Sequence, residues 1–281
     1  MTGAAGLAGG EIVRAFVHEG REVVGLVRNP SRRPQVPPGA RVELVDCADP
    51  AALDRVLVDG DILVHVAGIH LAESLARVDH LSALERLVVV SSASVLSPRH
   101  PMASRYEQWE ELVMKARPDA VLIRPTMIYG SERDRNVHRV VLFARRLKFL
   151  PLFGSGRGLI QPIHYEDLAR IVVRAADSIV GRALGAGGGS RVSLEQAGRL
   201  IFASLSLPTR LLRFPIVPAL AAARGWDRAS GQRTAEKLER LEEDRVVDNS
   251  ALLQLLAIGP RPFEVGLQDL VHRLRSAGYL R

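Results

Sequence analysis

Three glycines near the start of the chain have the spacing of a turn that holds phosphate groups. Gly3, Gly6 and Gly9 lie three residues apart, directly before an amphipathic run from Glu11 to Glu19. A glycine turn that opens a helix lets the backbone approach a pyrophosphate, toward which the first helical N–H groups point. We therefore expect a dinucleotide to bind here, with a flexible glycine-rich terminus as the alternative. The residues expected to hold the pyrophosphate are Gly3, Ala5, Gly6, Leu7 and Ala8.

A basic and an acidic side chain follow the next two apolar runs. Arg28 comes directly after the run 22–27, where the adenosine ribose of a bound cofactor would lie. An arginine there can pair with the 2′-phosphate of NADP, whereas a carboxylate would bond the ribose hydroxyls of NAD. We therefore expect NADP to be favoured over NAD, unless Arg28 is an ordinary surface arginine. Asp46, after the run 41–45, is expected either to bond the adenine amino group or to cap a helix near Pro50.

Small residues follow two further apolar runs. Ala67 and Gly68 end the segment that starts at Asp61, and they would let the backbone pass against the ribose of the cofactor. Pro125 follows the run 121–123 and is expected to line the nicotinamide. His65 is interpreted as a hydrogen-bonded strand histidine rather than a catalyst.

These candidate residues are spaced by short apolar runs that alternate with helix-compatible segments. This order predicts an α/β fold with a doubly wound parallel sheet, whose ligand lies at the carboxyl ends of the strands. The expected strands are 22–27, 41–45, 62–66, 87–90 and 121–123, and the expected helices are 11–19, 50–58, 73–85 and 104–115.

A strand should also precede the glycine turn, yet only Met1 and Thr2 stand there. That strand is central in this fold. Without it, its two neighbours would keep unpaired backbone groups, each costing on the order of 1–3 kcal/mol. We therefore expect the first strand to be missing from this sequence and the natural protein to begin several residues upstream.

The composition is typical of a soluble globular protein. The 281 residues are 47% hydrophobic and 25% charged, with no apolar run near the roughly 20 residues that a membrane span needs. No basic segment precedes an apolar one at the N-terminus, as it would in a secretory signal. The single cysteine, Cys47, excludes an internal disulfide and a thiolate metal cluster. We expect no metal and a cytoplasmic location.

The net charge of +7 does not indicate nucleic-acid binding. The basic residues are scattered as short pairs such as Arg32-Arg33 and Arg145-Arg146, and aromatic residues make up only 5% of the chain. Nucleic-acid-binding proteins gather their basic residues on one face. We therefore expect no nucleic-acid partner, and a basic surface that attracts an anionic cofactor or substrate.

Several segments together resemble the extended short-chain dehydrogenases/reductases of the NAD-dependent epimerase/dehydratase type. The resemblance implies a Rossmann-type NAD(P) domain and a smaller C-terminal lobe that covers the substrate, which in this family is often a nucleotide sugar. It spans nearly the whole chain. The segments that carry it are 2–9, 61–68, 90–95, 124–130, 161–169 and 259–263.

The family's usual catalysts are a Ser or Thr, a Tyr, and a Lys four residues after the Tyr. Ser94 matches the first of these and would orient a substrate hydroxyl. Tyr106 is the nearest tyrosine, but Glu110 stands four residues after it. A carboxylate cannot stabilise a phenolate as a lysine does, so the chain departs here from the family. Ser94 and Tyr106 are the catalytic candidates, with Tyr106 alternatively standing in the place of the lysine.

Two functions therefore stay open. The first is an epimerase, dehydratase or reductase acting on a nucleotide sugar or a related carbonyl compound, and we lean toward this enzyme, with a homodimer as its candidate assembly. The second is a non-catalytic NAD(P)H-binding regulatory or assembly protein. Residues 116–125 resemble the branch of the family that contains an accessory subunit of respiratory complex I.

The second half of the chain is expected to form most of the substrate lobe. We expect a Rossmann domain in residues 1–180, with 126–160 contributing to the lobe, and mainly the lobe in 181–281. Ser193 and Gln196 have the pattern of a capping box at a helix start. The apolar residues of the segment 211–225 are interpreted as core of this lobe, with a membrane-surface or partner-binding helix as the alternative.

Overall fold

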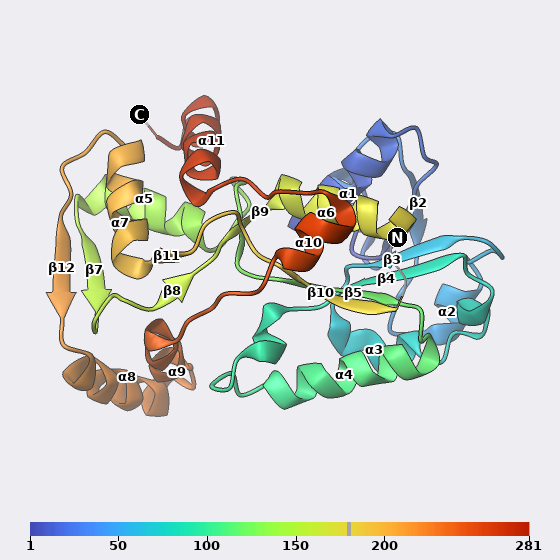
Figure 1. The fold of residues 1–281 in the computed structure, drawn as a ribbon, viewed down its shortest axis with the longest axis horizontal. Coiled ribbons are helices and arrows are strands. Elements are labelled where there is room, and N and C mark those ends of the chain that lie inside the picture. Colours follow the sequence, from blue (N-terminus) through green and yellow to red (C-terminus); the bar gives the residue numbers. More distant parts are fainter. Residues whose placement is uncertain (179–180, 281) are drawn as a thin grey trace. The chain divides into compact units, whose positions relative to one another are not determined.

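The computed structural model describes residues 1–178 and 181–280, and the chain forms two units that interleave in sequence (Figure 1). Unit 1 comprises residues 1–126, 165–187 and 247–260, and unit 2 comprises the rest. The sequence predicted a division at residue 180, which lies outside the described residues, with 126–160 already contributing to the lobe. In the structure, residues 127–164 belong to unit 2, and the chain passes between the units again after residues 187, 246 and 260. The functions assigned to the two parts stay predictions.

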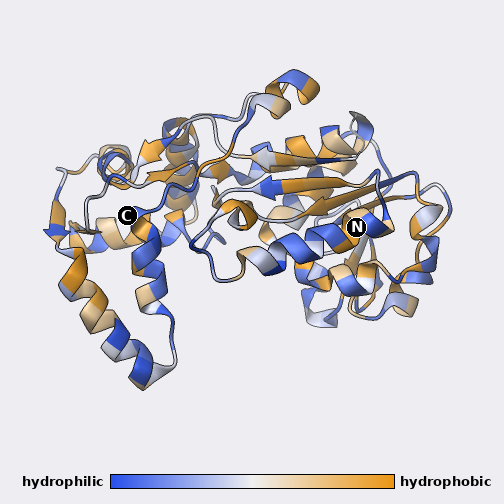
Figure 2. Cartoon of the chain, turned by 60° about the horizontal axis from the view of Figure 1, so that its bottom comes forward, coloured by the Kyte–Doolittle hydropathy of each residue, from blue (hydrophilic) through white to orange (hydrophobic). Residues whose placement is uncertain are grey.

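Unit 1 contains a parallel sheet of short apolar strands. Strands buried on both faces need nearly continuous apolar runs, and strands of this sheet are drawn largely in orange in Figure 2, whereas the strand at residues 41–44 is partly exposed. The predicted α/β fold with a parallel sheet is confirmed. The strands β3 (Ile62–His65), β4 (Arg86–Val90), β5 (Val121–Pro125) and β10 (Arg182–Ala186) pair in the order β10-β5-β4-β3, and β1 (Val24–Val27) pairs with β2 (Arg41–Leu44).

Met1 and Thr2 lie between β1 and β3, where the sequence predicted a missing strand. Thr2 forms parallel bridges to Leu26 of β1 and to His65 of β3. The Leu26 N–H donates to the Met1 carbonyl at 2.8 Å, and the Thr2 N–H donates to the Val64 carbonyl at 3.0 Å. These two residues join the two parts of the sheet, beside a cavity of about 350 Å³ lined by both strands. The expectation of an upstream start stays a prediction.

Helices cover the sheet of unit 1. Among them, α6 packs against α1 and against the strands β4 and β5. One core cluster of the unit lies between the sheet and the helices α2, α3 and α4. The bounds are α1 (Leu7–His18), α2 (Pro50–Asp54), α3 (Ala72–Leu75), α4 (Ala103–Ala116), α6 (Tyr165–Ser178) and α10 (Ser250–Leu256).

The helix expected over residues 73–85 is wrong. The structure has only the one-turn α3 and a 3₁₀ turn at Asp79–Ser82. The buried residues Leu75, Val78, Leu81 and Leu84 recur every three positions. A spacing of three matches the 3₁₀ turn, in which side chains repeat every three residues, rather than the 3.6-residue period of an α-helix.

Unit 2 is built from paired short strands and helices around a core of its own. The predicted capping box is confirmed, because Ser193 and Gln196 exchange both hydrogen bonds at the start of α7. The strand pairs are β6 (Ile128–Tyr129) with β9 (Ile163–His164), β7 (Leu150–Phe153) with β12 (Leu211–Phe214), and β8 (Leu159–Ile160) with β11 (Val192–Ser193). The helices are α5 (Val137–Leu147), α7 (Leu194–Ser204), α8 (Ile216–Ser230), α9 (Thr234–Glu239) and α11 (Phe263–Ser276).

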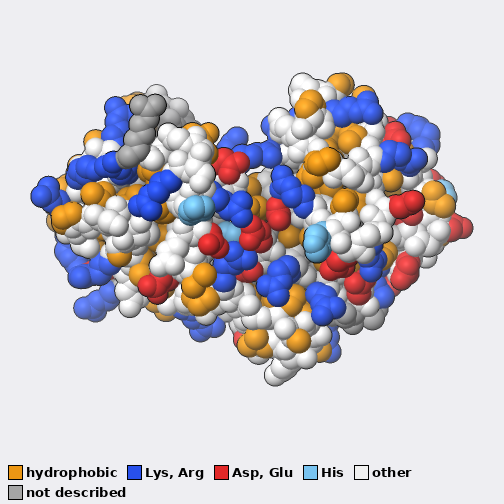
Figure 3. All heavy atoms as spheres, turned by 90° about the horizontal axis from the view of Figure 1, so that it is seen from above, with side chains coloured by type: hydrophobic (Ala, Val, Ile, Leu, Met, Phe, Trp, Pro, Cys, Tyr) orange, Lys and Arg blue, Asp and Glu red, His pale blue; other side chains and the backbone are white. Residues whose placement is uncertain are grey.

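The charged residues of the surface are dispersed. On the face drawn in Figure 3, Lys and Arg side chains stand among acidic and apolar ones and form no single basic stripe. In the part of the chain that the structure describes, no helix combines the length and the apolar character needed to cross a bilayer.

Candidate functional site

Backbone atoms crowd the glycine turn and fix its shape. Gly3 has a φ of +67°, and a Cβ there would lie 2.8 Å from the Ala67 nitrogen. A Cβ on Gly9 would run into the Gly3 carbonyl oxygen. Both positions therefore require glycine. Helix α1 starts at Leu7 with Gly6 as its cap, and no side chain of the described residues caps its first turn. The N–H groups of that turn are thus open to an anion.

A pocket of about 580 Å³ opens at this turn, wholly within unit 1. Of the predicted cofactor-binding residues, Leu7 and Ala8 open α1 beside the pocket without lining it, Gly68 caps a 3₁₀ turn, and Pro125 ends β5. The roles of all these residues as cofactor contacts stay predictions. The predicted residues that line the pocket are Gly3, Ala5, Gly6, Arg28, Asp46 and Ala67.

Two arginines make part of the pocket wall basic. Arg28 and Arg32 line it, and neither forms an ion pair with a described residue. Asn29 lies between them, and its Oδ1 accepts the Ser31 N–H at 2.9 Å, which fixes the start of the 3₁₀ turn that carries Arg32. Two guanidinium groups beside an open pocket could hold a phosphate group.

Asp46 is the one acidic residue on the wall of this pocket. Its Oδ1 accepts the Ala48 N–H at 3.0 Å, and Asp49, rather than Asp46, caps α2. The capping alternative for Asp46 is therefore wrong. The neighbouring Cys47 also lines the pocket, and burial raises the pKa of its thiol, which favours the neutral form.

His65 is held in a closed network of hydrogen bonds at the end of β3. Its Nε2 lies 3.1 Å from the Gly68 carbonyl, to which it donates, and its Nδ1 lies 3.1 Å from the Thr2 hydroxyl. That hydroxyl in turn accepts the N–H groups of Val66 and Ala67 at 3.0 and 3.1 Å. Because the oxygen accepts twice, its proton is directed to Nδ1, and the ring is neutral. Burial lowers the pKa of His65 to about 4. This geometry agrees with a structural histidine.

The hydroxyl groups of the serines after β4 have different surroundings. The Ser91 hydroxyl donates to Glu110 Oε1 at 2.5 Å, and the Ser92 hydroxyl accepts the Ser94 N–H at 3.1 Å. The Ser94 hydroxyl forms no hydrogen bond with any described residue, and the side chain is half-buried in a 3₁₀ turn at Ala93–Leu96. Of the three, Ser94 is thus the serine whose hydroxyl is left for another molecule.

Tyr106 lies in the first turn of α4 within an aromatic cluster. Its ring meets Trp109 at 5.6 Å and His100 at 5.8 Å between centroids, both edge to face. Its hydroxyl forms no hydrogen bond with a described residue. One turn later, the buried carboxylate of Glu110 is held by the Arg124 guanidinium and by Ser91. Glu110 therefore links α4 to the ends of β4 and β5.

Several residues of this region were missed by the sequence analysis. Asn29, Cys47 and His70 line the pocket, and His70 also meets the edge of Trp109 at 6.3 Å. The Asn-Pro pair at residues 29–30 is a signal for a turn that could have shown Asn29. No sequence pattern marks His70. It reaches the pocket through a 3₁₀ turn after Gly68, and no local signal in the sequence indicates that turn.

The comparisons with known proteins agree with this geometry. A family model described as NAD(P)H-binding matches residues 3–147, a stretch that contains every residue lining the pocket. The Arabidopsis thaliana protein NADH dehydrogenase (ubiquinone) 1 alpha subcomplex subunit 9, mitochondrial, is 31% identical over 166 residues, which are 56% of this chain and 40% of that protein. Ceramide reductase of Caulobacter vibrioides is 32% identical over 195 residues, which are 62% of this chain and 59% of that protein.

The chain spans about half the length of these curated relatives. Among solved structures, the UDP-glucuronic acid 4-epimerase of Bacillus cereus, in complex with UDP-glucuronic acid and NAD, has a TM-score of 0.77 at 18% identity, with 98% of each chain covered. At that identity the likeness concerns the fold. The chain therefore belongs to the NAD(P)H-binding family and has the fold of the extended short-chain dehydrogenases/reductases.

Proposed function

We propose that the protein is an NADP(H)-dependent reductase of a carbonyl compound. The observation that carries the choice of NADP(H) is the pocket itself, which combines the glycine turn with the guanidinium groups of Arg28 and Arg32. The N–H groups at the start of α1 would hold the pyrophosphate. The two arginines would pair with the 2′-phosphate, and Asp46 would accept from the adenine amino group.

Reduction suits the residues around α4 better than oxidation of a hydroxyl. Bound NADPH would supply a hydride to the carbonyl carbon, and the oxygen would then need a proton. A phenol without a lysine beside it is suited to donate a proton rather than to accept one, so Tyr106 would act as the acid. The Ser94 hydroxyl, which has no partner among the described residues, would orient the carbonyl oxygen. The substrate class, a nucleotide sugar or another carbonyl compound, is part of this proposal.

Binding calorimetry with NADPH and NADH tests the cofactor. We expect NADPH to bind more tightly than NADH. In Arg28→Ala, the affinity for NADPH should fall by about tenfold because one charge-assisted bond to the phosphate is lost. NADH affinity should change little in this variant. Equal loss of both cofactors would place Arg28 away from the 2′-phosphate and would contradict the preference for NADP(H).

The second candidate is a cofactor-binding subunit without turnover. It is favoured by the engagement of Glu110 with Arg124 at the position where the family has its lysine, and by the similarity to a subunit of NADH dehydrogenase. The two candidates differ in a measurable way. For a reductase, NADPH oxidation with a panel of aldehydes and ketones should exceed the background and fall at least about a hundredfold in Tyr106→Phe. An unchanged background rate in that variant and in Ser94→Ala, with NADPH still bound, would support the second candidate.

A further inference from the structure

Helix α8 of unit 2 leaves most of its surface uncovered. Ala223 is its one buried residue, while Val217 is 74% exposed and Trp226 is 58% exposed. The strand β12 leads directly into this helix, and its Leu212 and Phe214 are exposed as well. We call these four exposed side chains the α8 surface. The interpretation of the segment 211–225 as core is thus wrong for α8.

Most of the apolar residues on the exposed side of α8 are small. On a helix of 3.6 residues per turn, Val217 and Trp226 flank a strip of small residues. No exposed residue of the helix is acidic, and the helix is hydrophobic toward its N-terminal half (Figure 2). The strip consists of Pro218, Ala221, Ala222, Gly225 and Ala229.

Basic residues outnumber acidic ones along the segment that carries the α8 surface, whereas α9, which packs against α8, adds Glu236 and Glu239. Residues 210–233 contain five arginines and a single acidic residue, Asp227. The two carboxylate oxygens of Asp227 accept the N–H groups of Thr234 and Ala235, both at 2.8 Å, so this charge is used in holding α9. An apolar strip bordered by arginines is complementary to a surface that is apolar and negatively charged.

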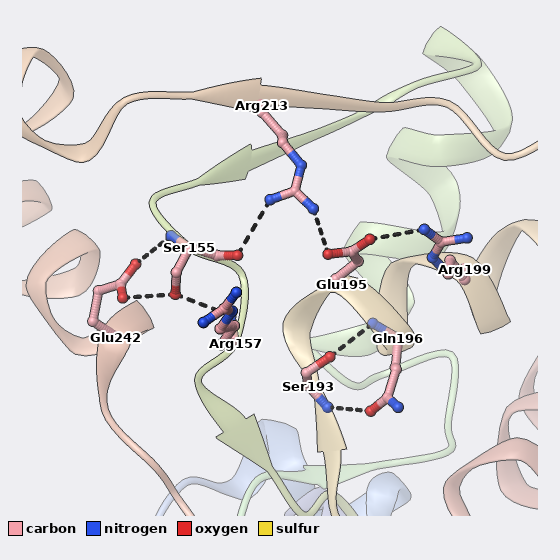
Figure 4. A network of polar contacts seen from close by, with 8 residues as sticks. All are labelled: Ser155, Arg157, Ser193, Glu195, Gln196, Arg199, Arg213 and Glu242. Carbon is pink, nitrogen blue, oxygen red and sulfur yellow. Dashed lines mark hydrogen bonds and ion pairs between the residues drawn. The ribbon is translucent and has the colours of Figure 1, made fainter.

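The arginines differ in their partners, and Arg233 lies 3.9 Å from the Glu236 carboxylate. Arg213 donates to the Ser155 carbonyl and to the Glu195 carboxylate and thereby anchors β12 to the neighbouring loop and helix (Figure 4). Arg224 is paired with Glu239 at 2.7 Å. Arg228 forms no hydrogen bond or ion pair with a described residue and is exposed. Arg213 and Arg224 therefore hold β12 and α8 in place, and Arg228 is available to a partner.

We propose that the α8 surface docks the protein on an anionic lipid bilayer. The helix has 15 residues, and such an amphipathic helix lies in the plane of the interface with its apolar side at the acyl boundary. Tryptophan favours this depth, and each arginine near an anionic leaflet strengthens the attraction. The inference goes beyond the proposed function and does not depend on it, because vesicle binding requires no turnover.

The test uses the full chain and vesicles of phosphatidylcholine with or without about one-third phosphatidylglycerol. Sedimentation should recover the protein with the anionic vesicles only, and added salt should weaken binding. The chain has two tryptophans, of which Trp109 is buried. In Trp109→Phe, the remaining indole at Trp226 should shift its emission to shorter wavelength when anionic vesicles are added. The double variant Val217→Asn, Arg228→Glu should bind at least about tenfold more weakly.

The matched control makes the same two changes on unit 1, where Arg55 and Val58 are both exposed. Arg55→Glu with Val58→Asn should leave vesicle binding unchanged, and circular dichroism checks that both double variants are folded. Equal binding to neutral vesicles, or equal binding by the α8 variant and the native chain, would overturn the proposal. A dimer in light scattering that Val217→Asn abolishes would overturn it too, because the surface would then be covered by a second copy.

Discussion

The glycine turn and the α4 region of unit 1 are held together by different kinds of contact. In the turn, backbone atoms contact one another, and a Cβ on Gly3 or Gly9 has no room. In the α4 region, side chains pair with side chains, with Glu110 held by Arg124 and Ser91. The shape of a turn built from backbone contacts therefore depends on glycine at particular positions. In a region built from side-chain contacts, single substitutions can remove individual hydrogen bonds or ion pairs.

The largest effect is expected at Gly9. In Gly9→Ala, the added methyl group meets the Gly3 carbonyl oxygen, so either α1 or the turn must shift. We expect a loss of roughly 3 kcal/mol or more in the free energy of unfolding, together with loss of NADPH binding. Urea unfolding and calorimetry measure the two quantities. In the control Gly225→Ala, nothing lies within 4 Å of the new Cβ, and the helix should be unchanged or slightly stabilised. Similar losses in both variants would mean that packing against the turn is not the cause.

The same difference explains how much could be predicted from the sequence. The glycine spacing and the apolar runs predicted the turn and the five strands, because backbone conformation and burial depend on local residue types. The sequence did not show that the helix expected at 73–85 is interrupted, because apolar residues repeating every three positions resemble the 3.6-residue repeat of an α-helix. The network of Glu110 joins residues 14 and 19 positions apart through tertiary contacts, and no local pattern carries it.

The structure of unit 2 was less predictable for a related reason. The exposed α8 surface has the apolar composition of a core segment, and only its packing shows that Ala223 alone is buried. Hydrophobicity indicates that a residue can be buried, and the neighbouring elements decide whether it is.

A pH titration of stability tests whether His65 belongs to the backbone-built part. The pKa of this ring is lowered to about 4 in the folded chain, below its ordinary value of 6.5. Between these values, only the unfolded chain binds the proton, so the free energy of unfolding falls as the pH drops from 6.5 toward 4. The expected contribution of His65 is roughly 3 kcal/mol over this range. Unfolding measured at intervals of pH should show a flatter dependence in His65→Gln than in the native chain.

An intermediate effect is expected from the buried ion pair of the α4 region. Glu110→Gln removes the negative charge and leaves the Arg124 guanidinium, whose side chain is only 24% exposed, without a counter-ion. We expect a loss of about 2 kcal/mol in the free energy of unfolding, moderated because the amide oxygen can still accept one bond. The exposed neighbour Glu111→Gln serves as the matched control and should change stability by less than about 0.5 kcal/mol. Equal effects would show that the pair contributes nothing beyond surface charge.

The smallest effect separates two serines that are three residues apart. Ser91 donates to the buried Glu110 carboxylate, so Ser91→Ala should cost about 1 kcal/mol of folding stability. The Ser94 hydroxyl forms no hydrogen bond with a described residue, so the free energy of unfolding of Ser94→Ala should lie within about 0.5 kcal/mol of that of the native chain. If the protein is a reductase, the order is reversed for turnover, and Ser94→Ala lowers the rate far more than Ser91→Ala does. Stability and rate measured on the same pair therefore distinguish a serine that holds the fold from one that is left for a substrate, and a Ser94→Ala variant that is destabilised as much as Ser91→Ala would place its hydroxyl in the framework instead.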